Sequence, residues 1–117
     1  MIHGIGIDLV EIKRIQEILE RQPGFPKRIL TSNEYEHYLE LSNHRQTEFL
    51  AGRFAAKEAF SKAMGTGIGQ DTSFQDFEIL PNEKNKPMPY TTLFSGNVHV
   101  SISHSDTYAI AEVLLEQ

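Results

Sequence analysis

The chain contains no cysteine among its 117 residues, which excludes disulfide cross-links, thiolate catalysis and cysteine-bound zinc. It also lacks any long apolar run, because its uninterrupted apolar stretches are only a few residues long and roughly 20 are needed to cross a bilayer. The first six residues show neither the basic region nor the long apolar region of a secretory signal. We therefore expect a cytoplasmic protein that does not associate with membranes.

Positive charge is also scarce, because 11 lysines and arginines face 16 acidic residues and the net charge is −5. This balance argues against general affinity for nucleic acid. One segment is basic, since residues 13–28 hold only two acids and five cations: Lys13, Arg14, Arg21, Lys27 and Arg28. Arg14, Ile18 and Arg21 share one helical stripe, which is either a solvated cationic face or a docking site for an acidic helix.

No repeat, low-complexity tract or linker divides the chain, so we expect a single domain over residues 1–117. The hydrophobic periodicity predicts an α+β fold with an opening strand, three helices and then an antiparallel set of strands. The segment 82–89 is polar and indicates a turn. The expected helices cover about 12–22, 31–41 and 44–64, and the expected strands cover about 3–10, 76–81, 98–103 and 108–115.

The helix over residues 44–64 is expected to be the central element of the fold. It is free of proline, rich in alanine, and followed by Gly65 as a C-terminal stop. Its apolar residues occupy two sides, with Phe49 and Phe60 on one and Ala51 and Phe54 nearly opposite. A helix that is apolar on two sides is typical of a buried position, and it is also compatible with packing against a neighbouring subunit.

Asp8 is the first candidate functional residue. It falls near the end of the opening strand, on the face that it shares with Gly4 and Gly6. It could serve as a metal-binding carboxylate, with the two glycines leaving room for a bulky anionic ligand near the backbone. Alternatively, it caps the helix that follows. The glycines do not form a dinucleotide fingerprint, because Leu9 stands where the third glycine is required.

Glu58 is the second candidate, because it lies on an apolar side of the central helix between Phe54 and Lys62. A buried carboxylate there must be paired or must bind a ligand. The alternative is an ordinary ion pair with Lys62 one turn later, which contributes about 0.2–0.5 kcal/mol. Mg²⁺ suits Asp8 and Glu58 well, since it binds one or two carboxylates together with water and phosphate oxygens. Lys62 would add positive charge beside a transferring phosphoryl group.

The strand over residues 98–103 carries a third set of candidates. His99, Ser101 and Ser103 project to one side, and we expect His99 and Ser101 to face solvent. His104 follows at the strand end, where it could reach into a cleft as a phosphate donor or proton carrier. A serine hydrolase is disfavoured because the chain has no G-x-S-x-G motif.

Three segments together resemble the holo-(acyl carrier protein) synthases, the small 4′-phosphopantetheinyl transferases. The segments are Gly6–Val10 (GIDLV), Arg53–Lys62 (RFAAKEAFSK) and Val100–His104 (VSISH), and their order and spacing cover essentially the whole chain. The resemblance implies the 4′-phosphopantetheinyl transferase fold, with helices around a long central helix and C-terminal antiparallel strands. It also implies a homotrimer with active sites at the subunit boundaries.

The resemblance further implies a reaction. The 4′-phosphopantetheine arm of coenzyme A would pass to a serine of apo acyl carrier protein, for fatty acid biosynthesis, and adenosine 3′,5′-bisphosphate would leave. Asp8 and Glu58 would hold Mg²⁺ against the coenzyme A pyrophosphate, and Glu58 or a metal-held water would accept the serine proton. Lys62 would stabilise the departing phosphate. Together with Lys62, Arg53 and His104 would contact the coenzyme A phosphates.

The same resemblance gives the stripe of Arg14, Ile18 and Arg21 a partner, the acidic carrier protein. Two positions distinguish this chain within the wider pattern. Asn85 replaces the glycine of the usual G-K-P turn, and because asparagine tolerates positive φ we expect the turn to persist. Val10 stands where the larger surfactin-type relatives carry a second acid, so the metal should keep an additional water there.

Two other functions would use the same residues. A coenzyme A or nucleotide sensor would bind without turnover, and a Mg²⁺-dependent phosphohydrolase would use water in place of a serine hydroxyl. Asp8 and Glu58 weigh against the sensor, because binding alone does not require a metal-bridged pyrophosphate.

Overall fold

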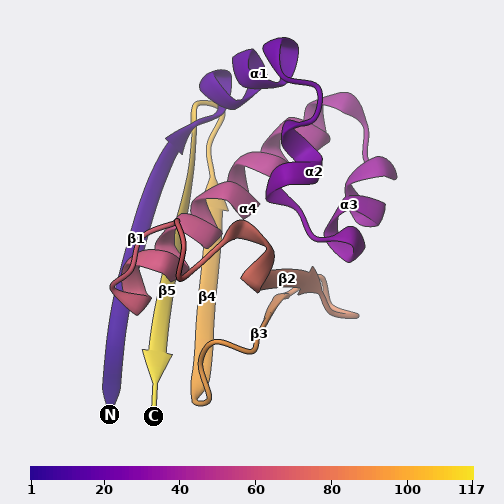
Figure 1. Cartoon of the computed structure of the whole chain (residues 1–117). Helices are drawn as coiled ribbons and strands as arrows, with labels where there is room; N and C mark the ends of the chain where they lie inside the picture. Colours follow the sequence, from indigo (N-terminus) through magenta and orange to yellow (C-terminus); the bar gives the residue numbers. More distant parts are fainter.

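The computed structural model describes residues 1–117 and shows the expected α+β fold (Figure 1). No helix in it is both long and apolar enough to span a membrane. In chain order the elements are β1 (Ile2–Glu11), α1 (Ile12–Arg21), α2 (Phe25–Ile29), α3 (Ser32–Leu39), α4 (Asn43–Met64), the 3₁₀ turn η1 (Phe74–Asp76), β2 (Phe77–Pro81), β3 (Pro87–Thr91), β4 (Asn97–His104) and β5 (Tyr108–Glu116).

The strands form two antiparallel sheets. The larger has the order β1-β5-β4, so β1 and β4 are its two edges, and the smaller is the β2–β3 hairpin. The expected antiparallel pairing of the last two strands is confirmed. One row across the larger sheet joins Asp8 of β1, Ala111 of β5 and Ile102 of β4. The chain ends lie side by side, where the Met1 amino group donates a hydrogen bond to the Gln117 carbonyl at 2.6 Å (Figure 1).

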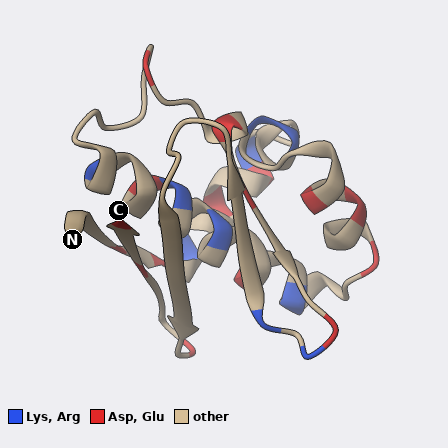
Figure 2. Ribbon diagram, turned by 90° about the horizontal axis from the view of Figure 1, so that it is seen from below, with Lys and Arg blue, Asp and Glu red and all other residues tan.

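Helix α4 is the centre of the fold, as predicted. It crosses one face of the larger sheet, mainly over β1 and β5, while α1, α2, α3 and the β2–β3 hairpin cover its other sides (Figure 1). Gly65 ends it in the left-handed conformation, with φ of 83°. Most of the apolar surface of α4 is thus covered within this chain, and exposed positions such as Lys62 remain at its two ends. Basic and acidic positions are interspersed along the helices around it (Figure 2).

Gly4 and Gly6 seat α4 against β1. A Cβ atom on Gly6 would lie 1.8 Å from the Ala59 carbonyl oxygen, and one on Gly4 would lie 2.0 Å from that of Ala63. The helix backbone therefore occupies the space that the sequence suggested for a ligand, and that interpretation was wrong. The glycines instead allow a close strand–helix contact, which brings β1 side chains up to the last turns of α4.

Two short elements were not predicted. Helix α2 follows directly after Pro23–Gly24, with Pro26 in its first turn, where a missing N–H does no harm. Strand β3 contains Pro87 and Pro89. These prolines are tolerated because β3 forms the edge of a two-stranded sheet. Between β2 and β3, Asn85 adopts φ of 65°, so the expected positive-φ turn is confirmed.

Candidate active site

Asp8, Glu58 and Lys62 converge where β1 passes the last turns of α4. The Lys62 ammonium donates to Asp8 Oδ1 at 2.9 Å and to the Ile7 carbonyl at 3.0 Å. The alternative Glu58–Lys62 ion pair does not form, because Lys62 reaches across to the strand. Asp8 does not cap the following helix either, since the N-cap position belongs to Glu11, whose side chain makes no capping bond.

The Glu58 carboxylate is half-buried, and its pKa is shifted. Burial raises its pKa above the ordinary value, the Asp8 charge raises the pKa further, and the Lys62 ammonium opposes both effects. Two carboxylates from different elements therefore lie close enough to repel each other, and the Glu58 carboxylate accepts no hydrogen bond from the protein. Oxygen ligands of this kind fit a hard cation such as Mg²⁺, whose remaining positions water and phosphate oxygens fill.

The two carboxylates lie at an open edge of the chain. They line none of the four best-formed cavities. Asp8 is on the inner face of β1, which is an edge of the larger sheet. Within one chain the two carboxylates are half-buried at the edge of the sheet, and Lys62 beside them is exposed.

Arg53 and His104 lie on the opposite side of α4, toward the β4 edge. Both line a small cavity of about 150 Å³ between α3, α4 and β4, together with His37, Leu41, Arg45, Glu48, Phe49, Gly52 and Ile102. The Arg53 guanidinium stacks on the Phe49 ring at 4.2 Å and donates from Nε to the Ile79 carbonyl at 3.3 Å. Burial lowers its pKa to about 10, although the nearby Glu34 carboxylate opposes that shift.

His104 ends β4, as the sequence predicted, and its ring faces a carboxylate. Nδ1 lies 3.6 Å from Glu48 Oε2, which also pairs with His44 at 3.3 Å. His99 and Ser101 are exposed, as expected. The predicted phosphate contacts Arg53 and His104 thus share one cavity, but a single chain does not bring them to Asp8 and Glu58.

The stripe on α1 differs in one detail from its prediction. Arg14 and Arg21 are exposed, whereas Ile18 is half-buried and packs against the core. The surface is therefore two separated cations with only part of an isoleucine between them.

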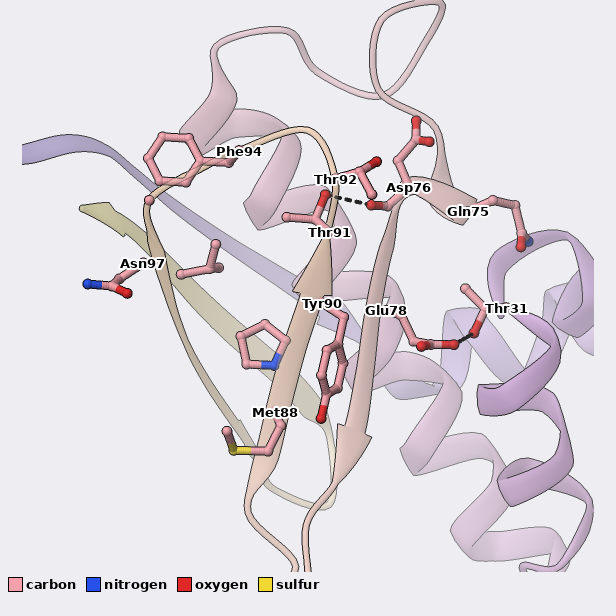
Figure 3. A pocket seen from close by; sticks show the side chains of 13 residues that line it. Thr31, Gln75, Asp76, Glu78, Met88, Tyr90, Thr91, Thr92, Phe94 and Asn97 are labelled. Atoms are coloured by element: carbon pink, nitrogen blue, oxygen red, sulfur yellow. Dashed lines mark hydrogen bonds between the residues drawn. The ribbon is translucent and has the colours of Figure 1, made fainter. Parts of the chain in front are cut away.

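A larger cavity lies elsewhere, between the β2–β3 hairpin and β4 (Figure 3). It encloses about 660 Å³, and its charged lining residues, Asp76 and Glu78, are already hydrogen-bonded to Ser73 and Thr31. None of the residues that the sequence singled out lines it.

The feature that sequence reasoning missed is a buried ion pair. Lys57 and Glu34 have fully buried side chains, and Lys57 Nζ lies 2.6 Å from Glu34 Oε1. Burial lowers the pKa of Lys57, and the Glu34 charge counteracts this. Glu34 also forms a capping box with Thr31 at the start of α3. A lysine surrounded by alanine and phenylalanine in the central helix was the available signal.

Comparison with known proteins identifies the family of this chain. The chain belongs to the 4′-phosphopantetheinyl transferase superfamily, which it matches over residues 4–113. Its full-length relatives are holo-(acyl-carrier-protein) synthases. The enzyme of Anoxybacillus flavithermus is 55% identical over 117 residues, with 100% of this chain and 98% of the relative covered. That of Bacillus subtilis is 55% identical over 118 residues, with the same coverage.

Solved structures match as well. The Bacillus anthracis holo-(acyl-carrier-protein) synthase, in complex with coenzyme A (3′,5′-ADP), is 50% identical with a TM-score of 0.92, and the match covers 98% of this chain and 96% of that one. The Helicobacter pylori enzyme in complex with coenzyme A is 34% identical with a TM-score of 0.86, covering 96% of this chain and 99% of that one. These matches establish the fold.

Proposed function

We propose that this chain is a Mg²⁺-dependent holo-(acyl-carrier-protein) synthase. It transfers 4′-phosphopantetheine from coenzyme A to a serine of apo acyl carrier protein, in fatty acid biosynthesis. The observation that supports this proposal most is that Asp8, Glu58 and Lys62 converge. They do so in a chain that is 55% identical, over its full length, to such an enzyme. Residues 1–117 act as one domain in this reaction.

Asp8 and Glu58 are the proposed metal ligands. Bound there, Mg²⁺ would supply positive charge to the coenzyme A diphosphate as the phosphoryl group moves. Asp8 is held in place by Lys62. Glu58 or a metal-held water would accept the proton of the attacking serine hydroxyl.

Lys62 has a second proposed role as a phosphate contact. Its side chain is 51% exposed, so the ammonium faces the open edge while it bonds Asp8. A positive charge fixed at that place stabilises the leaving adenosine 3′,5′-bisphosphate. Arg53 and His104 contribute further phosphate contacts from the β4 edge.

The outer face of the larger sheet, on the side away from α4, is apolar. This face supports a homotrimer in which neighbouring subunits share active sites. Ile5, Ile7 and Leu9 point away from α4 and are 59%, 52% and 59% exposed, and Tyr108 and Ile110 continue the patch on β5. Contiguous exposed apolar surface of this kind is typical of a protein–protein interface. Subunits joined through it would bring the β1 edge of one chain toward the β4 edge of the next.

The main experiment measures the product directly. The protein is incubated with coenzyme A, Mg²⁺ and apo acyl carrier protein, and the carrier is weighed by mass spectrometry. A gain of one phosphopantetheine that disappears with EDTA and returns with Mg²⁺ supports the proposal. Release of adenosine bisphosphate without carrier modification would indicate a phosphohydrolase, and no reaction would indicate a sensor.

Subunit mixing tests the shared site. Asp8→Ala and His104→Ala subunits, each inactive alone, are unfolded together, refolded and assayed. If Asp8 and His104 of different subunits form one site, some mixed trimers carry an intact site and activity returns. A mixture no more active than either variant alone would contradict the shared site.

A further inference from the structure

The buried pair of Lys57 and Glu34 has no part in the reaction described so far. All three protons of the Lys57 ammonium are used: one goes to Glu34 Oε1 at 2.6 Å, one to the Ile29 carbonyl at 2.8 Å and one to the Phe74 carbonyl at 2.9 Å. A single side chain of α4 is therefore hydrogen-bonded to the end of α2, the first turn of α3 and the η1 turn.

Glu34 extends this network to the β2–β3 hairpin. Oε1 accepts from Lys57 and from the Thr31 amide at 2.9 Å, and Oε2 accepts from the Ile79 amide at 2.7 Å. Thr31 in turn bonds the Glu78 carboxylate of β2, as Figure 3 shows. The start of α3 thus holds two successive residues of β2.

Ile79 connects the buried pair to Arg53. Strand β2 pairs only with β3, so the free edge of β2 needs other partners for its backbone. At Ile79 both backbone hydrogen-bond partners are side chains. Glu34 accepts from the Ile79 N–H, and Arg53 donates to the Ile79 carbonyl at 3.3 Å. The place of the Arg53 guanidinium is consequently tied to Glu34, and through it to Lys57.

A role in stability alone explains this pair poorly. Two well-packed apolar side chains commonly serve a fold as well as a buried ion pair does, because taking both charges out of water is costly. What apolar side chains cannot do is hold two carbonyls and the Ile79 amide at fixed places.

We propose that Lys57 and Glu34 are positioning residues for coenzyme A: through Ile79 they fix β2 and Arg53 relative to the turn of α4 that carries Glu58. This proposal rests on the function proposed above. It predicts that loss of the pair weakens coenzyme A binding while the chemical step proceeds, because Asp8, Glu58 and Lys62 stay on the β1 side of α4.

The test replaces both members by methionine, Glu34→Met with Lys57→Met, so that no buried charge is left unpaired. The matched control is Lys27→Met with Glu36→Met, which removes the same two charges from exposed positions. For the buried double variant we expect a lower melting temperature, because the Ile29 and Phe74 carbonyls and the Ile79 amide lose their partners, so binding and kinetics are measured at a temperature where the variant is folded. We also expect the KM and the calorimetric Kd for coenzyme A to rise roughly tenfold or more, with kcat within threefold. The control should leave all four quantities unchanged.

A folded double variant with wild-type KM and Kd for coenzyme A would overturn the proposal. So would a loss of kcat at unchanged KM, which would place the pair in the chemical step. If the double variant does not fold, Glu34→Gln gives the same comparison, because its amide cannot accept from Lys57 and Ile79 at both former oxygens. Absence of transfer by the wild-type protein would instead refute the proposed function itself.

Discussion

The substitution Gly6→Ala tests how the fold builds the active site. The new Cβ would lie 1.8 Å from the Ala59 carbonyl oxygen, whereas ordinary contact begins at 3.4 Å. Because the opposing atom is backbone, β1 and α4 must separate locally by about 1.6 Å. Asp8, two residues along β1, would then move out of reach of Lys62 Nζ, which now lies 2.9 Å from it.

Both stability and activity should fall. Overpacking costs typically about 1–3 kcal/mol, and we expect about 3 kcal/mol here because no side chain can yield. At roughly 4 °C per kcal/mol, the melting temperature should fall by about 12 °C. A displacement of about 1 Å in a positioned catalytic group costs on the order of a hundredfold in rate.

The assays are thermal unfolding and the rate of phosphopantetheine transfer at a temperature where the variant is folded. Gly24→Ala is the control, because a Cβ there meets no atom within 4 Å. It should change stability by less than about 0.5 kcal/mol and leave transfer unaltered. A Gly6→Ala protein with wild-type melting temperature and transfer rate would refute the close-contact reasoning.

Four further predictions concern single residues. Asp8→Ala and Glu58→Ala should each abolish transfer while the melting temperature changes little, and near-normal turnover in either would contradict the metal assignment. Arg14→Glu should raise the KM for carrier protein and leave coenzyme A binding intact, whereas equal loss of both would contradict docking at α1. If the proposed trimer forms through the sheet face, Ile7→Glu should give monomers in light scattering, and a mass equal to that of the wild type would contradict this interface. Burial, and then the neighbouring Tyr35, raise the pKa of the Tyr38 phenol, so its contribution to stability persists below pH 10 and is lost as the pH rises through that raised pKa. Tyr38→Phe should remove from the alkaline absorbance titration a phenol that titrates above its usual range, and an unchanged high-pH end of that titration would contradict this.

Much of the fold could be predicted because its signals are local. Alternation predicts β1, β4 and β5, and Gly65 marks the end of α4 through its left-handed conformation. The two omissions involve prolines. Pro23 and Pro26 made the sequence of the five-residue helix α2 look like a turn, and Pro89 did the same for β3. Strand β3 nevertheless accommodates Pro89, because its partner Ile79 donates its amide to Glu34 and needs no acceptor there.

The site was only partly predictable, because its contacts join residues far apart in the sequence. Asp8 and Lys62 are 54 residues apart, and Lys57 and Glu34 are 23 apart. Local spacing therefore suggested a Glu58–Lys62 ion pair as an alternative, and it could not indicate that Glu34 pairs with Lys57. Periodicity also could not show that Gly4 and Gly6 face a helix backbone, since that depends on which element covers β1.

The central claim is that Asp8 and Glu58 hold the cation that binds the coenzyme A diphosphate. A crystal structure of this chain with coenzyme A and Mg²⁺ tests it most directly. The account predicts one cation bonded to oxygens of both carboxylates and of the diphosphate. A coenzyme A molecule whose diphosphate lies away from Asp8 and Glu58, with no cation between them, would contradict it.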